Sequence, residues 1–225
     1  MLQSCTSEKS QDNSNSTILL KKIAVSGASI NFTYDGDKLS KIVYPAGDYA
    51  YFKITYTGDF ITRSEGFDKN NQPSNHNIFI YANNKLTQVD VYSSPTTLEE
   101  TYNYIYNIDG SITKKSNNSS SVYFFDNNGN ISKVKNYYNN SLQSTYDYNY
   151  DAKNNPFKNV IGYNPLLFGP NLMIWSMSTN NVTKQTITGS GSTNFDNSYQ
   201  YNSQDYPISC SSTSLGQTTV ATYFY

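Results

Sequence analysis

The stretch Ser121–Tyr138, SVYFFDNNGNISKVKNYY, decides the fold of this chain. Aromatic residues alternate before an Asn/Gly-rich segment, and aliphatic residues follow it. Asn, Asp and Gly tolerate the positive φ angles that tight hairpin turns require. The stretch therefore predicts one β-hairpin.

The same arrangement recurs six more times along the chain. The aromatic residues that precede the turns are separated by 22, 25, 25, 19, 25 and 51 residues. They are Tyr34, Tyr56, Tyr81, Tyr106, Phe125, Tyr150 and Tyr201. A period of roughly 20–50 residues is typical of repeat architectures. Each unit is here predicted to be one hairpin, with one unit expanded in the 51-residue interval.

Strand periodicity assigns these aromatic residues to one face of the sheet. Each is preceded, two positions earlier, by another large apolar residue, and the terminal Tyr223 and Tyr225 repeat this spacing. The pairs are Phe32/Tyr34, Ile54/Tyr56, Phe79/Tyr81, Tyr104/Tyr106, Tyr123/Phe125, Tyr148/Tyr150 and Tyr199/Tyr201. The intervening residues are mostly polar, as in Asn31/Thr33 and Ser198/Gln200. Such alternation predicts an antiparallel sheet with one covered and one wet face.

After the turns, apolar residues are spaced by three rather than two. The pairs are Leu39/Ile42, Leu86/Val89, Ile131/Val134 and Phe157/Val160. Residues three apart face opposite sides of a flat strand, so a bulge or a closing turn residue is expected near the first member of each pair.

Two units break the polar alternation. Ile78, Ile80, Val122 and Phe124 are apolar on the face that is polar elsewhere. Contiguous exposed apolar surface is uncommon in monomeric proteins. These four residues, together with Trp175, are the candidate binding residues. A partner, a dimer contact or a loop is expected to cover the central patch.

An apolar insertion explains the long interval. Residues 164–176, NPLLFGPNLMIWS, form the most apolar segment and show no alternation. We expect a short helical or irregular plug that packs against the aromatic face, with Trp175 buried. An amphipathic membrane contact is the alternative.

Composition excludes several classes of function. The 225 residues carry a formal net charge of −1, with 15% charged and 36% hydrophobic residues. Arg63 is the only arginine. Electrostatic binding of nucleic acid is therefore not expected. The 22 Tyr and 11 Phe argue against disorder, because aromatic side chains supply large buried area.

No constellation of residues points to catalysis, a metal or a cofactor. His76 is the only histidine, at the start of a strand, and is interpreted as a surface or turn residue. Asp126–Asn130, DNNGN, lacks the downstream Glu of a calcium loop and is better explained as a hairpin turn. A glycosidase needs two facing carboxylates. Of the four Glu, Glu8 lies in the tail, and Glu65, Glu99 and Glu100 lie beside predicted loops. We expect no enzyme.

The first residues resemble a bacterial lipobox. Leu2-Gln3-Ser4-Cys5 combines an aliphatic residue, two spacers and a cysteine, although no basic or apolar signal region precedes it. The resemblance implies cleavage before Cys5 and acylation of its thiol. Alternatives are an accidental Cys5 in a tail or a Cys5–Cys210 disulfide, with a buried free Cys210 preferred. Residues 1–17 are thus assigned to lipobox and tether, and residues 18–225 to a single domain.

The hairpins YDYNYDAKNNPFKNV and FFDNNGNISKV resemble YD repeats, the Tyr-Asp hairpins of RHS-type shells. With the lipobox, the insertion and the terminal YFY, residues 18–225 resemble more closely a family of Bacteroidetes lipoproteins of unknown function. This resemblance implies a porin-like β fold and brings no catalytic residues.

The expected fold is all-β. We predict an antiparallel hairpin meander of roughly 15–17 strands, curled into an open barrel-like sheet around the plug. A membrane pore is disfavoured, because the strands read as short and their second face carries Lys, Asp and Asn.

The expected function is a non-catalytic envelope lipoprotein, anchored to the outer membrane through Cys5 alone, that binds a glycan or a protein partner. A structural shell or scaffold without a small ligand is the alternative. Exposed, clustered aromatic residues with convergent Asn or Asp would favour binding, whereas fully buried aromatic residues would favour the scaffold.

Overall fold

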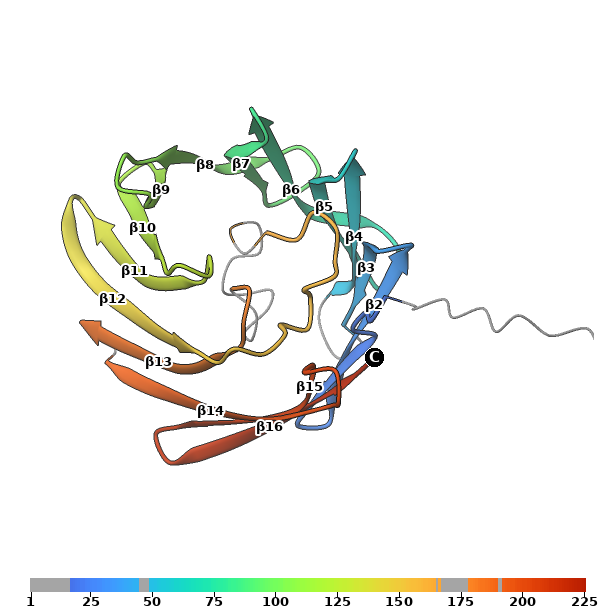
Figure 1. Cartoon of the computed structure of the whole chain (residues 1–225). Helices are drawn as coiled ribbons and strands as arrows, with labels where there is room; N and C mark the ends of the chain where they lie inside the picture. Colours follow the sequence, from blue (N-terminus) through green and yellow to red (C-terminus); the bar gives the residue numbers. More distant parts are fainter. Residues whose placement is uncertain (1–16, 45–48, 165, 167–177, 190–191) are drawn as a thin grey trace, which may run out of the picture.

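The computed structural model describes residues 17–44, 49–164, 166, 178–189 and 192–225, and these contain strands and no helix (Figure 1). The strands are β1 (Lys22–Val25), β2 (Ala28–Asp35), β3 (Lys38–Val43), β4 (Tyr49–Thr57), β5 (Phe60–Asp68), β6 (Pro73–Ala82), β7 (Lys85–Tyr92), β8 (Leu98–Tyr106), β9 (Ile112–Ser116), β10 (Ser119–Phe125), β11 (Ile131–Tyr138), β12 (Ser141–Tyr150), β13 (Val182–Gly189), β14 (Thr193–Tyr201), β15 (Pro207–Ser214) and β16 (Gln217–Phe224).

The sixteen strands form one closed antiparallel barrel in which each strand pairs with its neighbours in sequence. The strand count and the all-β meander confirm the prediction, but the predicted open sheet was wrong. The first strand pairs with the last, from Lys22 opposite Phe224 to Val25 opposite Ala221. Closure satisfies the edge hydrogen bonds that an open sheet would leave unpaired.

The predicted aromatic face lines the inside of the barrel. Phe32, Phe79, Tyr104, Tyr148 and Tyr223 are each 8% exposed or less. They lie near the end of the barrel formed by the turns that follow the even-numbered strands, here called the base end. Aliphatic residues from the odd-numbered strands, such as Leu39 and Ile61, complete this core and are fully buried.

Bulges explain the apolar residues spaced by three. Tyr34 pairs with Leu39, and Thr33 pairs with Lys41, so Ser40 is an extra residue in β3. The Ser40 hydroxyl donates to the carbonyl of Thr33 at 2.9 Å. Both Leu39 and Ile42 therefore point inward. Equivalent register shifts confirm the predictions for Leu86/Val89 and Ile131/Val134.

A hydrogen bond between a tyrosine hydroxyl and the main chain recurs around the base end. In every hairpin except β9–β10, a tyrosine hydroxyl bonds to the preceding odd-numbered strand or the segment leading into it. The hydroxyl donates to a carbonyl in each case except Tyr56, which accepts from the Leu39 amide. These residues, the base tyrosines, are Tyr34, Tyr56, Tyr81, Tyr106, Tyr150, Tyr199 and Tyr225, which bond to Leu20, Leu39, Ile61, Leu86, Ile131, Val182 and Pro207, respectively. Strand β10 ends instead in Phe125, which has no hydroxyl.

One connection leaves the barrel wall and crosses its interior (Figure 1). It joins β12 to β13, and its described residues 151–164, 166 and 178–181 are here called the floor. Phe157 and Val160 were expected after a hairpin turn, but they belong to the floor, where they are 2% and 6% exposed and pack into the core. Most of the predicted plug, 164–176, lies outside the described residues.

The floor is fastened to several turns of the base end. The Ile161 amide donates to the carbonyl of Asp37 at 3.0 Å, and the Asn154 amide donates to that of Asp205 at 3.0 Å. Gly162 lies so close to the β4–β5 turn that a Cβ atom there would be 3.1 Å from the Tyr56 ring and would overlap the carbonyl of Asp59. The described floor therefore covers part of the base end.

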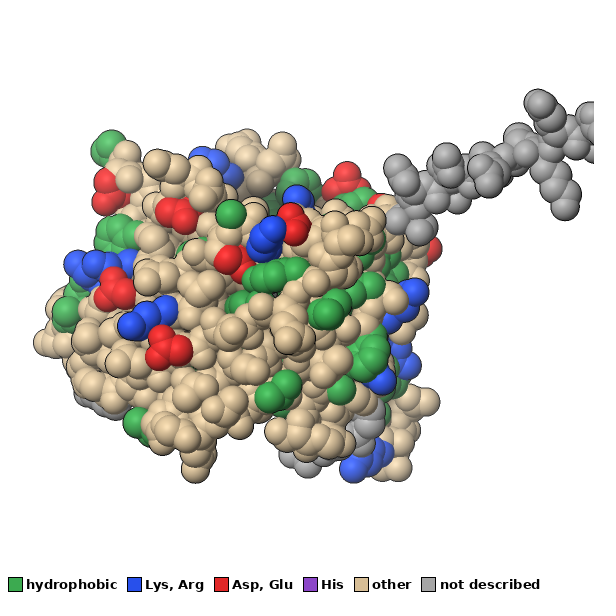
Figure 2. Space-filling view, turned by 60° about the horizontal axis from the view of Figure 1, so that its bottom comes forward, with side chains coloured by type: hydrophobic (Ala, Val, Ile, Leu, Met, Phe, Trp, Pro, Cys, Tyr) green, Lys and Arg blue, Asp and Glu red, His purple; other side chains and the backbone are tan. Residues whose placement is uncertain are grey.

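The outer wall of the barrel carries charged side chains within its strands. Ion pairs join Lys133 to Asp147 at 3.2 Å and Lys184 to Asp196 at 3.9 Å. Exposed apolar residues, such as Ile80 and Val220, also occur on this wall. Figure 2 shows one face, where hydrophobic and charged side chains are scattered among other groups.

Candidate functional site

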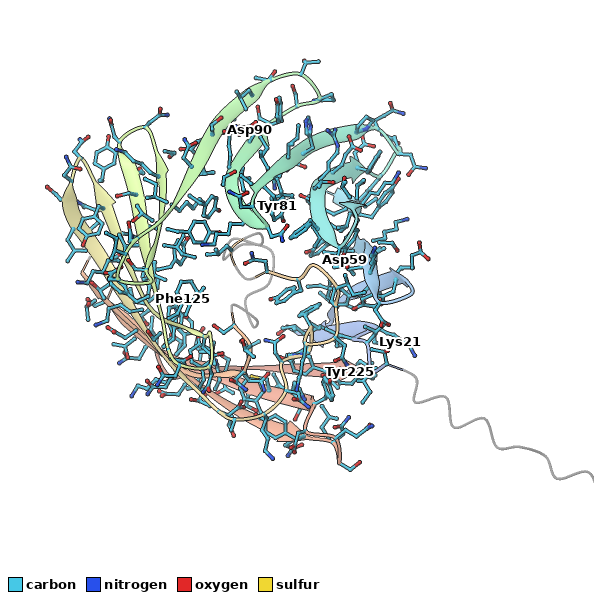
Figure 3. The ribbon with its side chains drawn as sticks, turned by 45° about the horizontal axis from the view of Figure 1, so that its top comes forward. Lys21, Asp59, Tyr81, Asp90, Phe125 and Tyr225 are labelled. Carbon is cyan, nitrogen blue, oxygen red and sulfur yellow. The ribbon has the colours of Figure 1, made fainter. Side chains whose placement is uncertain are left out.

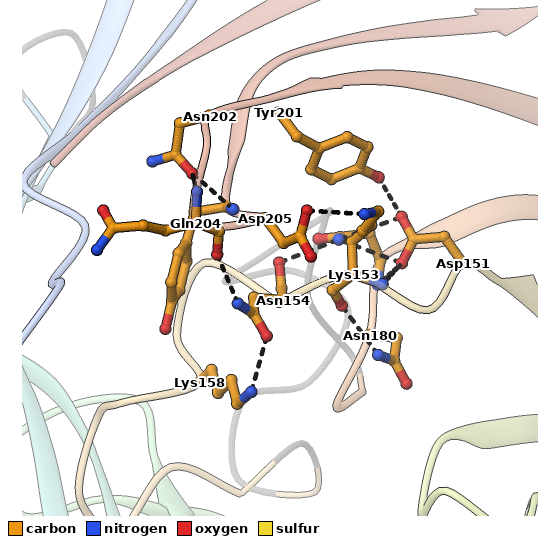
Figure 4. A network of polar contacts seen from close by, with 11 residues as sticks. Asp151, Lys153, Asn154, Lys158, Asn180, Tyr201, Asn202, Gln204 and Asp205 are labelled. Carbon is orange, nitrogen blue, oxygen red and sulfur yellow. Dashed lines mark hydrogen bonds and ion pairs between the residues drawn. The ribbon is translucent and has the colours of Figure 1, made fainter.

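A polar network holds the floor against the barrel wall (Figure 4). The Asp151 carboxylate accepts hydrogen bonds from the Tyr201 hydroxyl and the Asn181 side chain. The Lys153 ammonium is 2.7 Å from the Asp205 carboxylate, so the floor is tied to the β14–β15 turn. These polar groups bond to one another and tie the floor to the barrel wall.

A small cavity borders the floor. Its volume is about 170 Å³, and Asn155, Lys158, Val160, Tyr163, Ser178 and Thr179 line it. Sites for small organic ligands typically measure about 300–1,000 Å³. The cavity is therefore suited to water rather than to a sugar or a cofactor.

Polar and aromatic side chains cover the inner face of β8–β12 above the core. We call this group the inner polar wall. Its members are Glu100, Tyr102, Lys114, Ser116, Ser121, Tyr123, Asn136, Ser144 and Tyr146. They share the inward face because they alternate in step with core residues such as Tyr104 and Phe125, and the latter points into the barrel in Figure 3.

The carboxylate of Glu100 organises one end of this wall. It accepts a hydrogen bond from the Tyr102 hydroxyl on one oxygen and from the Ser116 hydroxyl on the other. The Lys114 ammonium lies 3.6 Å from the centroid of the Tyr102 ring, a cation–π contact. Burial lowers the pKa of Lys114, whereas the nearby Glu100 charge acts in the opposite direction. Burial raises the pKa of Tyr102, so its phenol remains a donor at neutral pH.

A hydrogen-bonded row continues across the next strands. The Ser121 hydroxyl donates to the side-chain oxygen of Asn136 at 2.7 Å, and the Asn136 amide donates to the Ser144 hydroxyl at 3.2 Å. Tyr123 and Tyr146, both half-buried, occupy the adjacent inward row, on either side of Val134. The wall thus offers hydroxyls, an amide, two charges and aromatic rings within one barrel interior.

The predicted apolar binding residues do not form a single patch. Ile78 and Ile80 lie on β6, Val122 and Phe124 lie on β10, and three strands separate the two pairs. All four face outward, and Ile80 is 40% exposed. Trp175 and Cys5 lie outside the described residues, so burial of Trp175 stays a prediction.

Sequence reasoning missed the inner polar wall. Glu100 was assigned to the neighbourhood of a loop, but counting back in steps of two from Tyr104 places it inside the barrel. The alternation of TLEETYNYIY carries this signal, because Glu100 and Tyr102 precede Tyr104 in steps of two.

His76 differs from the expectation of a surface or turn residue. It lies within β6, is 5% exposed and stacks on Tyr92 with ring centroids 4.2 Å apart. Burial lowers its pKa. Cys210 is free and fully buried, as predicted. Among the described residues, no group of three His, Cys, Asp or Glu is placed to hold a metal ion.

Solved structures share this fold. A porin-like protein from Bacteroides vulgatus ATCC 8482 superposes with a TM-score of 0.56 and 16% identity, covering 92% of this chain and 98% of that chain. A porin-like protein from Bacteroides uniformis ATCC 8492 gives 0.55 and 13%, covering 92% and 97%. The porin-like fold is thereby confirmed. No family model and no curated protein sequence matches the chain.

The described residues include no helix that is long and apolar enough to span a membrane.

Proposed function

We propose that this protein is a non-catalytic lipoprotein of the bacterial envelope whose barrel binds a glycan on the inner polar wall. One observation carries the proposal. Hydrogen-bonding side chains and half-buried tyrosine rings converge on the inner face of β8–β12, whereas the base end is filled by apolar core. Sugars combine flat apolar faces with many hydroxyls, and this mixture of groups complements both.

The shape of the barrel supports binding rather than conduction. The floor crosses the base end and is fastened to its turns by main-chain hydrogen bonds. Because the described floor covers part of the base end, a ligand of the inner polar wall would enter from the opposite end.

The inner charges support a role without catalysis. Within the inner polar wall, Glu100 is the only acidic residue. Glycoside hydrolysis uses two carboxylates that flank the scissile bond, and the wall offers no second one.

The envelope location rests on two features. The described fold is shared with porin-like proteins of Bacteroides, and Leu2-Gln3-Ser4-Cys5 matches a lipobox. In this proposal the lipid on Cys5 is the only membrane contact, and nucleic acid is not a partner.

A structural scaffold related to YD-repeat proteins is the second candidate. The base-end aromatics favour it, because Phe32, Phe79 and Tyr223 are at most 6% exposed and serve the core. Tyr102, Tyr123 and Tyr146 are only half-buried, and a purely structural scaffold does not require partly exposed aromatic rings inside the barrel.

Affinity electrophoresis through immobilised polysaccharides tests the proposal. The wild type should be retarded by at least one polysaccharide, and Asn136→Ala should remove most of that retardation. Asn103→Ala is the matched control, because Asn103 is exposed on the outer face of β8. If no plant, host or bacterial polysaccharide retards the wild type, the scaffold is favoured. If a defined protein is then captured through the same wall, a protein partner is favoured instead.

A further inference from the structure

We infer that Lys114 is an anion-binding residue and that the ligand of the inner polar wall is an acidic glycan, a sugar chain bearing carboxylate or sulfate groups. The inference rests on the proposed function and specifies its ligand.

Charged residues are sparse on this part of the inner face. Along β9–β12, strand alternation and register place Lys114 as the only charged residue at an inward-facing position. Glu100 lies on the neighbouring strand, β8. Partly burying charged groups is costly, so their partners matter.

The two charges differ in how they are satisfied. Both oxygens of Glu100 accept a hydrogen bond, one from Tyr102 and one from Ser116. The Lys114 ammonium, by contrast, has no ion pair and no hydrogen bond among the described residues; its close contact is the Tyr102 ring at 3.6 Å. Glu100 supports this cation through space without pairing with it.

A partly desolvated ammonium that pairs with none of the described acceptors is available to an incoming anion. A carboxylate or sulfate oxygen would form a charge-assisted hydrogen bond with it. The Tyr102 ring is itself held in place by its bond to Glu100. The ammonium above it is therefore oriented before a ligand arrives.

The neighbouring groups define the rest of the ligand. Ser121 pairs with Lys114 across β9 and β10 and leads into the row that continues to Asn136 and Ser144. These groups can bond to sugar hydroxyls, while Tyr123 and Tyr146 offer apolar ring surface. The hydroxyls of a neutral sugar could accept hydrogen bonds from this row and from Lys114, but only an acidic sugar would also supply a counter-charge for the ammonium.

The neighbouring residues Lys114 and Lys115 provide a matched pair of variants. They are consecutive in β9, so Lys114 faces inward and Lys115 faces outward. Lys114→Gln and Lys115→Gln each remove one positive charge. Binding of each variant to an acidic polysaccharide that retards the wild type is compared with binding to the same polysaccharide after carboxyl reduction or desulfation.

Lys114→Gln should weaken binding about tenfold or more, as expected for loss of a buried charged contact. Carboxyl reduction or desulfation should have the same effect on the wild type, and whichever treatment acts identifies the anionic group. Lys115→Gln should bind as the wild type does. Urea unfolding of both variants checks that the barrel remains folded.

Two results would overturn the inference. One is equal binding of the native and the neutralised polysaccharide by the wild type. The other is equal loss in Lys114→Gln and Lys115→Gln. Either leaves glycan binding standing, whereas a wild type that binds no polysaccharide refutes the proposed function itself.

Discussion

The hydroxyl of Tyr81 donates a hydrogen bond to the main-chain carbonyl of Ile61, 2.9 Å away. This bond fastens the end of β6 to the start of β5 at the base end. The other base tyrosines make equivalent bonds to the main chain, with Tyr56 accepting from the Leu39 amide rather than donating. The repeated aromatic residue therefore has a structural role in every hairpin that carries it. The ring fills the core, and the hydroxyl satisfies the main chain of the preceding strand.

Tyr81→Phe tests the role of this hydroxyl. The variant keeps the ring and removes only the donor, so the free energy of unfolding should fall by about 1 kcal/mol. Urea unfolding followed by circular dichroism measures the change. Tyr138→Phe is the control, because Tyr138 is 53% exposed. Equal stability of the Tyr81→Phe variant and the wild type would show that the bond contributes nothing.

Gly162→Ala should loosen the floor. Gly162 has φ of +73°, and an added Cβ would meet the carbonyl of Asp59 and the Tyr56 ring. Gly110→Ala separates backbone strain from steric overlap. Gly110 also has a positive φ, +83°, but the space around its Cβ position is open. Steric overlap should make Gly162→Ala less stable than Gly110→Ala by about 1–3 kcal/mol. Similar stability losses in the two variants would mean that the floor does not press against the β4–β5 turn.

Alkaline pH should destabilise the barrel through its buried phenols. Burial raises the pKa of Tyr56 and of Tyr81 to about 12, against an ordinary value of about 10. Above pH 10 the unfolded chain loses these phenol protons while the folded chain keeps them. The free energy of unfolding therefore falls as the pH rises from 10 toward 12. Absorbance at 295 nm should therefore rise together with loss of circular dichroism. Full ionisation of all tyrosines in a folded barrel at pH 11 would contradict this.

Cys5 should carry lipid when the gene is expressed with a signal peptide. Metabolic labelling with palmitate should mark the parent, and Cys5→Ala should move the protein to the soluble fraction. Cys210→Ala is the control, because the Cys210 thiol is buried in the core. If Cys5→Ala is labelled as strongly as the parent, the acyl group is attached to another residue and Cys5 is not the anchor.

The sequence predicted the wall of the barrel better than its closure. Turn chemistry and two-residue alternation located the hairpins, and the three-residue spacing of Leu39 and Ile42 predicted the bulge that the structure contains. Closure depends on pairing between Lys22–Val25 and Ala221–Phe224, which are about 200 residues apart and share no local signal. A strand pattern alone does not distinguish an open edge from a paired one.

The floor and the candidate site were harder to foresee. YDAKNNPF has the residues of a hairpin turn, yet Phe157 is recruited into the barrel core, because tertiary burial outweighs local turn preference. Glu100 and Lys114 are charged residues at strand positions where apolar residues are expected. Only the pairing register of the strands shows that both face inward. Their hydrogen bonds depend on side-chain placement, which periodicity does not specify.

Binding by Tyr123→Ala and Phe124→Ala tests the central claim most directly. These consecutive residues of β10 point to opposite faces, Tyr123 into the barrel and Phe124 to the outside. Each is compared with the wild type by calorimetric titration of a polysaccharide that retards the wild type. The account predicts that Tyr123→Ala weakens binding about tenfold or more, in the range for loss of an aromatic anchor, while Phe124→Ala binds normally. Unchanged affinity in Tyr123→Ala with a loss in Phe124→Ala would place the ligand on the outer wall and contradict an interior site.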